Sequence, residues 1–279
     1  MLITILCILS ALLAAGICIG SGAFAGLAWL WALPVSFVGG FLTLGLAFFL
    51  LLWISCAVVN QNVPQKKDSK YYRMLADLIA DAAPAILRMR IHTQGLEKTP
   101  RQGRFLLVCN HLNDLDPVVL LRYFRKSQLA FISKRENSTM FLVGKIMHKI
   151  RCQLINREND KEALKTIINC IQIIKNDEAS IAVFPEGYTS RDHKFHDFRP
   201  GVFKIAQKAN VPIVVCTLTN TYKVLGNMKR LKPTDIELHL LDVLQPESFQ
   251  GMTAVDLARQ IHTMMADDLG PAYAPEQNT

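Results

Sequence analysis

A histidine and an aspartate five residues apart are the first residues of this sequence whose types could do chemistry together. His111 and Asp116 lie in residues 109–117, directly after the apolar run at residues 105–108. The run predicts a buried strand, so His111 is expected in a loop at the carboxyl end of a strand, where open α/β sheets place their ligands. A histidine there takes up a proton near neutral pH, and a carboxylate that receives its other ring N–H would fix its tautomer.

A plainer interpretation of the same stretch stays open. Asp116-Pro117 is typical of a helix start, with an N-cap followed by a first-turn proline, and apolar residues then recur at helical spacing. In that case Asp116 would be only a helix cap and His111 only a polar loop residue, since two residues five apart make a weak motif. The choice depends on residues further along the chain.

A second polar stretch, residues 184–191 (FPEGYTSR), follows another predicted buried strand. The chain turns at Pro185, and Gly187 permits a positive φ or a close approach of the backbone. Three polar side chains are then presented at the same kind of strand end as His111, namely Glu186, Ser190 and Arg191. A carboxylate, a hydroxyl and a guanidinium in one loop suit a head group with hydroxyls and a phosphate. Alternatively, the turn only connects two elements and Arg191 is solvated.

Basic residues gather between these two stretches. The set comprises Lys134, Arg135, Lys145, Lys149, Arg151 and Arg157. It could form an anion site for a phosphate, a nucleotide tail or an acidic protein surface. A solvated basic face is the favoured interpretation for most of the set. Arg157 is the exception, because it follows a predicted short strand as His111 does and is expected on the same rim of the sheet.

No metal site and no redox cofactor are predicted. His193 and His196 invite a metal interpretation, but they lie in a charged loop without an evident third ligand. The seven cysteines include no Cys-x-x-Cys pair, so neither zinc nor a redox dithiol is indicated, and they suit a reducing compartment.

The beginning of the chain is predicted to be a membrane anchor. No Lys, Arg, Asp or Glu precedes Lys66, so the formal net charge of +8 belongs to residues 66–279. Apolar runs at residues 1–33 and 35–59, separated by Pro34, each exceed the roughly 20 residues that a helix needs to cross a bilayer. They predict a hairpin or two adjacent spans.

A cleaved signal peptide is the alternative, with a small-residue cut site at residues 23–25. It lacks the positively charged n-region, and residues 35–59 would still span a membrane. Lysines gather just after the second run, at Lys66, Lys67 and Lys70. They favour the cytosolic side for the remainder of the chain.

Helices and strands alternate from residue 71 onward. Residues 71–88 predict an amphipathic helix that lies against the bilayer or packs on the domain, and Pro84 predicts a kink or break in it. Strands are predicted at residues 89–93, 105–109, 129–133, 152–155, 181–184, 211–218 and 236–243. Helices are predicted after Pro117, at residues 140–149, 161–175 and 202–209, and from Thr253 onward. The alternation predicts an α/β fold, a mostly buried mixed sheet flanked by helices.

The two loop motifs together resemble those of the glycerophospholipid acyltransferases, most closely the 1-acylglycerol-3-phosphate acyltransferases. The first family motif, Asn-His-x-x-x-x-Asp, is matched from Asn110 to Asp116, and the third, Phe-Pro-Glu-Gly-x-x-Ser, is matched at residues 184–190. The second motif centres on an arginine after a strand, which residues 144–157 match loosely. The fourth, an apolar strand with an early proline, is matched at residues 211–214.

The third motif departs from the family pattern. Relatives usually have Thr-Arg between the glycine and the serine, where this chain has Tyr188-Thr189. An arginine follows the serine instead, at Arg191. It is the candidate to make the contact that the motif arginine makes in the family.

The resemblance implies an acyltransferase domain at residues 89–279, after a membrane-anchoring hairpin at 1–65 and an amphipathic or linker helix at 66–88. His111 would be the general base that deprotonates an acceptor hydroxyl, and Asp116 would orient it. The hydroxyl would attack an acyl thioester directly, without a covalent enzyme intermediate. The residues then expected to hold substrate are Asn110, Arg157, Glu186, Gly187, Ser190 and Arg191.

The resemblance also implies the partners. The acceptor would be 1-acylglycerol 3-phosphate (lysophosphatidic acid), giving phosphatidic acid, and the donor an acyl-coenzyme A or an acyl-acyl carrier protein. No resident cofactor and no nucleic acid are expected, and the positive charge favours anionic lipids. The domain is expected on the cytosolic side of the cell membrane.

Other functions stay open at this point. The acceptor could be glycerol 3-phosphate or another lysophospholipid. A hydrolase of esters or thioesters is a further alternative, although the sequence lacks a Gly-x-Ser-x-Gly elbow. A non-catalytic scaffold that binds anionic lipid is the last.

Overall fold

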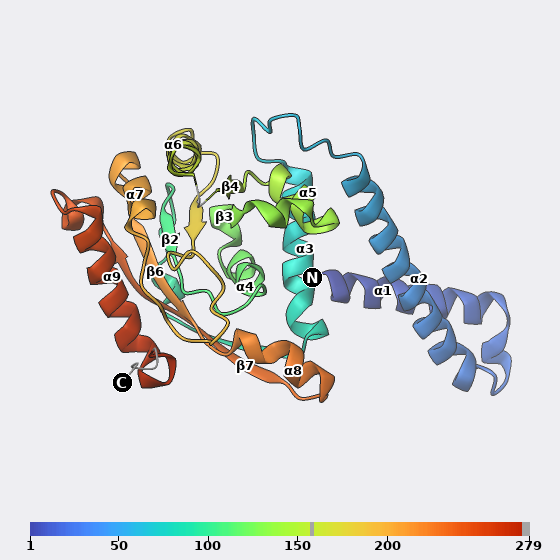
Figure 1. Ribbon diagram of the computed structural model, residues 1–279. Coiled ribbons are helices and arrows are strands. Elements are labelled where there is room, and N and C mark those ends of the chain that lie inside the picture. Colours follow the sequence, from blue (N-terminus) through green and yellow to red (C-terminus); the bar gives the residue numbers. More distant parts are fainter. Residues whose placement is uncertain (157–158, 275–279) are drawn as a thin grey trace. The chain divides into compact units, whose positions relative to one another are not determined.

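The computed structural model describes residues 1–156 and 159–274, which form two compact units (Figure 1). The units are Met1–Val63 and Pro64–Thr279. The first is helical and apolar, and the second contains the sheet.

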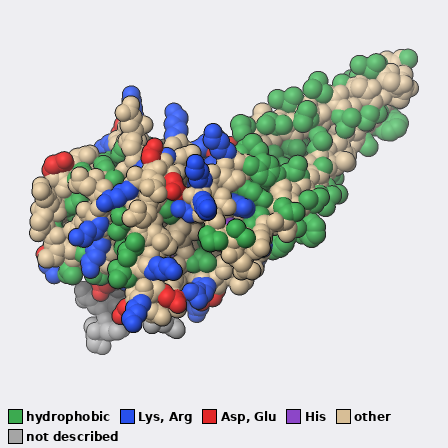
Figure 2. Space-filling view, turned by 90° about the horizontal axis from the view of Figure 1, so that it is seen from above, with side chains coloured by type: hydrophobic (Ala, Val, Ile, Leu, Met, Phe, Trp, Pro, Cys, Tyr) green, Lys and Arg blue, Asp and Glu red, His purple; other side chains and the backbone are tan. Residues whose placement is uncertain are grey.

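Two apolar helices, α1 (Leu2–Gly20) and α2 (Trp29–Ala57), make up most of the first unit. Both are long and apolar enough to cross a membrane. On the face seen in Figure 2, this unit carries many hydrophobic side chains and no Lys, Arg, Asp or Glu. Pro34 was expected to separate the two apolar runs, and this was wrong, because it lies inside α2. Helix α2 continues through Pro34 without the hydrogen bond that a backbone N–H at this position would have made.

Seven strands form one mixed sheet in the order β1-β7-β6-β2-β5-β3-β4. Their bounds are β1 Met89–Gln94, β2 Leu106–Val108, β3 Ala130–Lys134, β4 Gln153–Ile155, β5 Ile181–Val183, β6 Ile213–Leu218 and β7 Thr234–Leu244. The five strands from β6 to β4 are parallel, β7 is antiparallel to β6, and β1 is parallel to β7. The predicted mixed sheet is confirmed.

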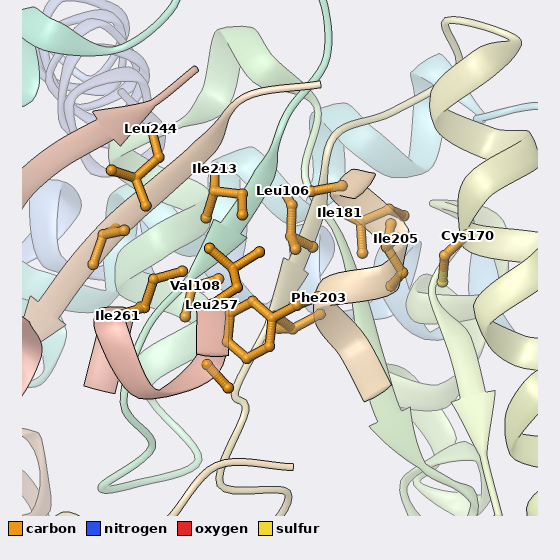
Figure 3. Close-up of a cluster of buried hydrophobic side chains, with 14 of the residues drawn as sticks. Leu106, Val108, Cys170, Ile181, Phe203, Ile205, Ile213, Leu244, Leu257 and Ile261 are labelled. Atoms are coloured by element: carbon orange, nitrogen blue, oxygen red, sulfur yellow. The ribbon is translucent and has the colours of Figure 1, made fainter. Parts of the chain in front are cut away.

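Helices cover both faces of the sheet (Figure 1). Their bounds are α3 Lys70–Ile86, α4 Asp116–Tyr123, α5 Phe141–Lys149, α6 Asp160–Lys175, α7 Lys204–Ala209, α8 Val224–Lys229 and α9 Ala254–Leu269. On one face, α6, α7 and α9 enclose a hydrophobic cluster, where Leu106 and Ile181 of the sheet meet Phe203 and Leu257 (Figure 3). The opposite face is covered by α3 and α4 (Figure 1).

Two helices differ from the expectation. Pro84 lies in the last turn of α3 and does not break it, and Leu75 and Leu78 of this helix are buried against the sheet unit. Helix α8 was not predicted, because it is only six residues long and buries a single apolar side chain, that of Val224.

The strand order fixes where the chemistry lies. Strand β2 pairs in parallel with β5 on one side and with β6 on the other, with Val108 opposite both Val183 and Val215. The carboxyl ends of parallel neighbours meet at one edge of a sheet, so the segments that follow these three strands lie side by side.

Candidate active site

The His111 loop and the loop after β5 are joined by backbone hydrogen bonds. The N–H of Cys109 donates to the carbonyl oxygen of Val183 at 3.2 Å, and the N–H of Ser190 donates to that of His111 at 3.0 Å. The two motifs, far apart in sequence, therefore form one site, as their position after two strands predicted.

A single oxygen of the Asp116 carboxylate holds the His111 ring. Oδ2 accepts from His111 Nδ1 at 2.9 Å and from the backbone N–H groups of Leu112 and Asn113 at 2.7 and 2.8 Å. Asp116 is fully buried. It is the first residue of α4, whose N-cap is Leu115, so the interpretation as a mere helix cap was wrong. Because an ionised carboxylate only accepts, Nδ1 carries the proton and Nε2 is left as the basic nitrogen.

Two further side chains contact the imidazole. The Phe184 ring stacks on it with centroids 4.1 Å apart and planes 14° apart. The Thr189 hydroxyl oxygen lies 2.9 Å from His111 Nε2. The His111 side chain keeps 15% of its surface exposed, so the site opens to solvent. Sequence reasoning did not assign these two residues, since loop residues carry no periodic signal of what they contact.

The Glu186 carboxylate joins the His111 loop to the loop after β5. It is buried, with Oε1 accepting from the N–H of His111 at 2.9 Å and Oε2 from the N–H of His196 at 3.1 Å. Burial raises the pKa of Glu186 to about 7, although both backbone hydrogen bonds act in the opposite direction. Its carboxylate is occupied by the protein itself.

Asn110 and Ser190 also bind within the protein. Asn110 is fully buried, and its amide donates to the carbonyl oxygen of Leu218 and accepts from the N–H of the same residue. The Ser190 hydroxyl, buried as well, lies 2.6 Å from Asp192 Oδ1 and 2.7 Å from the Lys194 carbonyl oxygen. In this geometry the polar atoms of Asn110, Glu186 and Ser190 are bound within the protein and position the loops, and their contact with substrate stays a prediction.

Gly187 lies under an arginine that the sequence did not single out. Its φ is +86°, and a Cβ there would come within 2.9 Å of Arg199 Cδ, so only glycine fits this turn. The backbone N–H of Arg199 donates to the Pro185 carbonyl oxygen at 2.8 Å. The side chains of Arg199 and Arg191 are exposed and make no ion pair with any residue that the structure describes. Arg157, expected on the same rim, lies outside the described residues.

The other described basic residues of the set fit a solvated face only in part. Lys134 and Arg135 are exposed, whereas Lys145, Lys149 and Arg151 are half-buried. Arg135 pairs with Glu162 at 2.8 Å and Arg151 pairs with Glu178 at 2.7 Å, so both guanidinium groups are occupied.

The two histidines of the charged loop have partners of their own. The His193 ring stacks on Tyr222, and His196 Nε2 lies 2.9 Å from Asp192 Oδ1. Among the described residues, no cluster of three or more His, Cys, Asp or Glu side chains could hold a metal ion.

Comparisons with known proteins find similarity to acyltransferases. Residues 90–219 match the protein family described as Acyltransferase. A probable 1-acyl-sn-glycerol-3-phosphate acyltransferase of Mycoplasma genitalium is 26% identical over 82% of this chain and 89% of its own length. The protein of the same description from Mycoplasma pneumoniae is 30% identical over 70% of this chain and 75% of its own.

A solved structure has the same fold. The crystal structure of the 1-acyl-sn-glycerophosphate acyltransferase from Thermotoga maritima superimposes with a TM-score of 0.62 at 20% identity, and the match covers 85% of this chain and 98% of that one. At this identity the likeness shows the fold.

The raised pKa of Glu186 predicts a pH-dependent stability. Because burial lifts this pKa from its ordinary 4.5 to about 7, the folded protein binds a proton that the unfolded chain has lost between these values. The contribution of Glu186 protonation to the free energy of unfolding is fully present below pH 4.5 and is lost as the pH rises through 7. Thermal unfolding of Glu186→Gln at pH 5 to 8 should show a flatter decline of Tm than the wild type, whereas parallel curves would contradict the assignment.

Proposed function

The chain belongs to the glycerophospholipid acyltransferase family and is an O-acyltransferase, and from this premise we propose that it moves a fatty acyl group from a thioester to the free hydroxyl of 1-acylglycerol 3-phosphate. The product is phosphatidic acid. The observation that carries the mechanism is the His111–Asp116 pair, which leaves one basic nitrogen at an open rim of the sheet.

His111 Nε2 takes the proton of the acceptor hydroxyl as the oxygen attacks the thioester carbonyl carbon. Asp116, bound to Nδ1, stabilises the imidazolium that forms and keeps the ring in place. The C–S bond of the tetrahedral intermediate then breaks, and the departing thiolate takes the proton back from Nε2. The ester and a free thiol are the products, and no resident cofactor takes part.

The acceptor phosphate needs a cationic partner near the loop after β5. Arg199 is the best placed of the described arginines, because its side chain lies across Gly187, beside the buried Glu186. Its guanidinium can donate two parallel hydrogen bonds to a phosphate. Arg191 is the second candidate on the same loop. This assignment fits a loop that lacks the family's usual arginine before Ser190.

The lipid substrates account for the first unit. Both acceptor and product reside in a bilayer, and two helices long enough to span one precede the catalytic unit. Lys66, Lys67 and Lys70 follow them and favour the cytosolic side for the catalytic unit. There the donor is acyl-coenzyme A or an acyl-acyl carrier protein, and the net charge of +8 favours acidic donors and anionic lipids.

Replacing the base tests the function. His111→Ala should lower the rate of phosphatidic acid formation by about 10²- to 10⁴-fold, the usual contribution of a positioned general base. The assay uses detergent-purified full-length protein, labelled acyl thioester and lysophosphatidic acid. Glycerol 3-phosphate is supplied in parallel, with one sample lacking any acceptor.

A matched control is available in β1. His92 also faces an aspartate, with Nε2 lying 3.1 Å from Asp235 Oδ1, but this pair is exposed and outside the site. His92→Ala should keep full activity. If the label appears on glycerol 3-phosphate alone, the protein is still an acyltransferase, but the proposed acceptor is wrong. An active His111→Ala variant would refute the mechanism.

Arginine variants test the phosphate contact. Arg199→Ala should raise KM for lysophosphatidic acid about tenfold or more, because a charge-assisted hydrogen bond contributes about 1.5–3 kcal/mol. The KM for monoacylglycerol, which has no phosphate, should stay the same. Arg191→Ala should have the smaller effect, and Arg259→Ala on α9, which is exposed, serves as the charge control. Equal KM values in wild type and Arg199→Ala would contradict the assignment.

A further inference from the structure

The basic nitrogen of His111 is already occupied by a hydroxyl group of the same chain. Nδ1 is bound to Asp116, Phe184 covers a ring face, and the Thr189 hydroxyl oxygen lies 2.9 Å from Nε2. With the proton on Nδ1, Nε2 can only accept, so Thr189 donates its hydroxyl hydrogen. This is the contact that an acceptor hydroxyl must make before transfer.

We infer that Thr189 determines the choice between lipid and water: its hydroxyl keeps water away from His111 Nε2 until the acceptor lipid displaces it. The inference rests on the proposed acyl transfer. It concerns a specificity-determining residue that the family pattern does not supply, since relatives usually have an arginine at this position of the motif.

The backbone on both sides of Thr189 is held in place. On the carboxyl side, the N–H of Ser190 donates to the His111 carbonyl oxygen at 3.0 Å, and the Ser190 hydroxyl is bound within the loop. On the other side, Gly187 makes the turn with a positive φ. The Thr189 side chain itself is only half buried. Its hydroxyl is therefore delivered to Nε2 by a fixed backbone, while rotation about χ1 leaves room to withdraw it.

Water and lipid differ in what they bring to this exchange. A tethered hydroxyl competes at high effective concentration, and a water molecule that replaces it gains one hydrogen bond for the one lost. The lipid also binds through its phosphate and acyl chain, and that remote binding energy can move Thr189 aside. In hydrolysis a water proton would pass to Nε2, its oxygen would bond to the thioester carbon, and the thiolate would leave with the proton. Thr189 suppresses this reaction.

Removing the hydroxyl tests the inference. Thr189→Ala should raise thioester hydrolysis without acceptor by about tenfold, measured as free fatty acid and thiol released from palmitoyl-coenzyme A. Thr189→Ser, which keeps the hydroxyl, should stay near the wild-type rate. Thr263→Val, on the exposed side of α9, is the control. With lysophosphatidic acid present, the ratio of fatty acid to phosphatidic acid should rise in Thr189→Ala. Circular dichroism checks the fold of each variant.

The sign of the change decides the outcome. The gain should vanish in the double variant His111→Ala with Thr189→Ala, because hydrolysis then lacks its base. Unchanged hydrolysis in Thr189→Ala would overturn the inference. A lower rate of hydrolysis in Thr189→Ala would also overturn it if the wild type carries an acyl adduct, seen by intact mass spectrometry, that the variant lacks. Thr189 would then be a nucleophile. A wild type that hydrolyses thioester but forms no phosphatidic acid would refute the proposed function. A wild type that forms phosphatidic acid, with unchanged hydrolysis in Thr189→Ala, would overturn the inference alone.

Discussion

One oxygen atom of a fully buried carboxylate organises the site. Asp116 Oδ2 accepts from the His111 ring and from two successive backbone N–H groups of the loop. A buried charge is tolerable only when it is paired and hydrogen-bonded, so the loop must close around this oxygen for the protein to fold. The same closure sets the ring orientation, the tautomer and the start of α4. Catalytic geometry and local folding are therefore two consequences of one interaction.

Buried polar groups extend this arrangement to the neighbouring strands. Glu186 ties the loop after β5 to the backbone of His111, and Asn110 ties the end of β2 to Leu218 at the end of β6. Each group replaces a ladder hydrogen bond where the regular pairing has ended. Three strand ends are joined in this way. The loop after β5 then holds Thr189 beside the base, and the Arg199 side chain lies against Gly187 of the same loop.

The sequence is sufficient for the order of elements and for the pairing of the two motifs. Apolar runs predict buried strands, and polar residues after such runs predict a site at the strand ends. It cannot show which strands are neighbours, and therefore it does not reveal that the polar atoms of Asn110 and Ser190 are bound within the protein. Thr189 and Arg199 act through contacts that depend on the turn at Gly187. The position of Pro34 inside a helix and the existence of α8 depend on tertiary context, which overrides the local sequence pattern.

Asp116 holds His111 in the tautomer with its proton on Nδ1 and its basic nitrogen at Nε2. This assignment is tested most directly by ¹⁵N NMR of histidine-labelled protein in detergent at about pH 8.5, two units above the pKa of an unperturbed ring, with His111→Ala to assign the signals. We expect a protonated Nδ1 and an unprotonated Nε2 for His111 in the wild type, and a mixture of tautomers in Asp116→Asn. A protonated Nε2 in the wild type would contradict it.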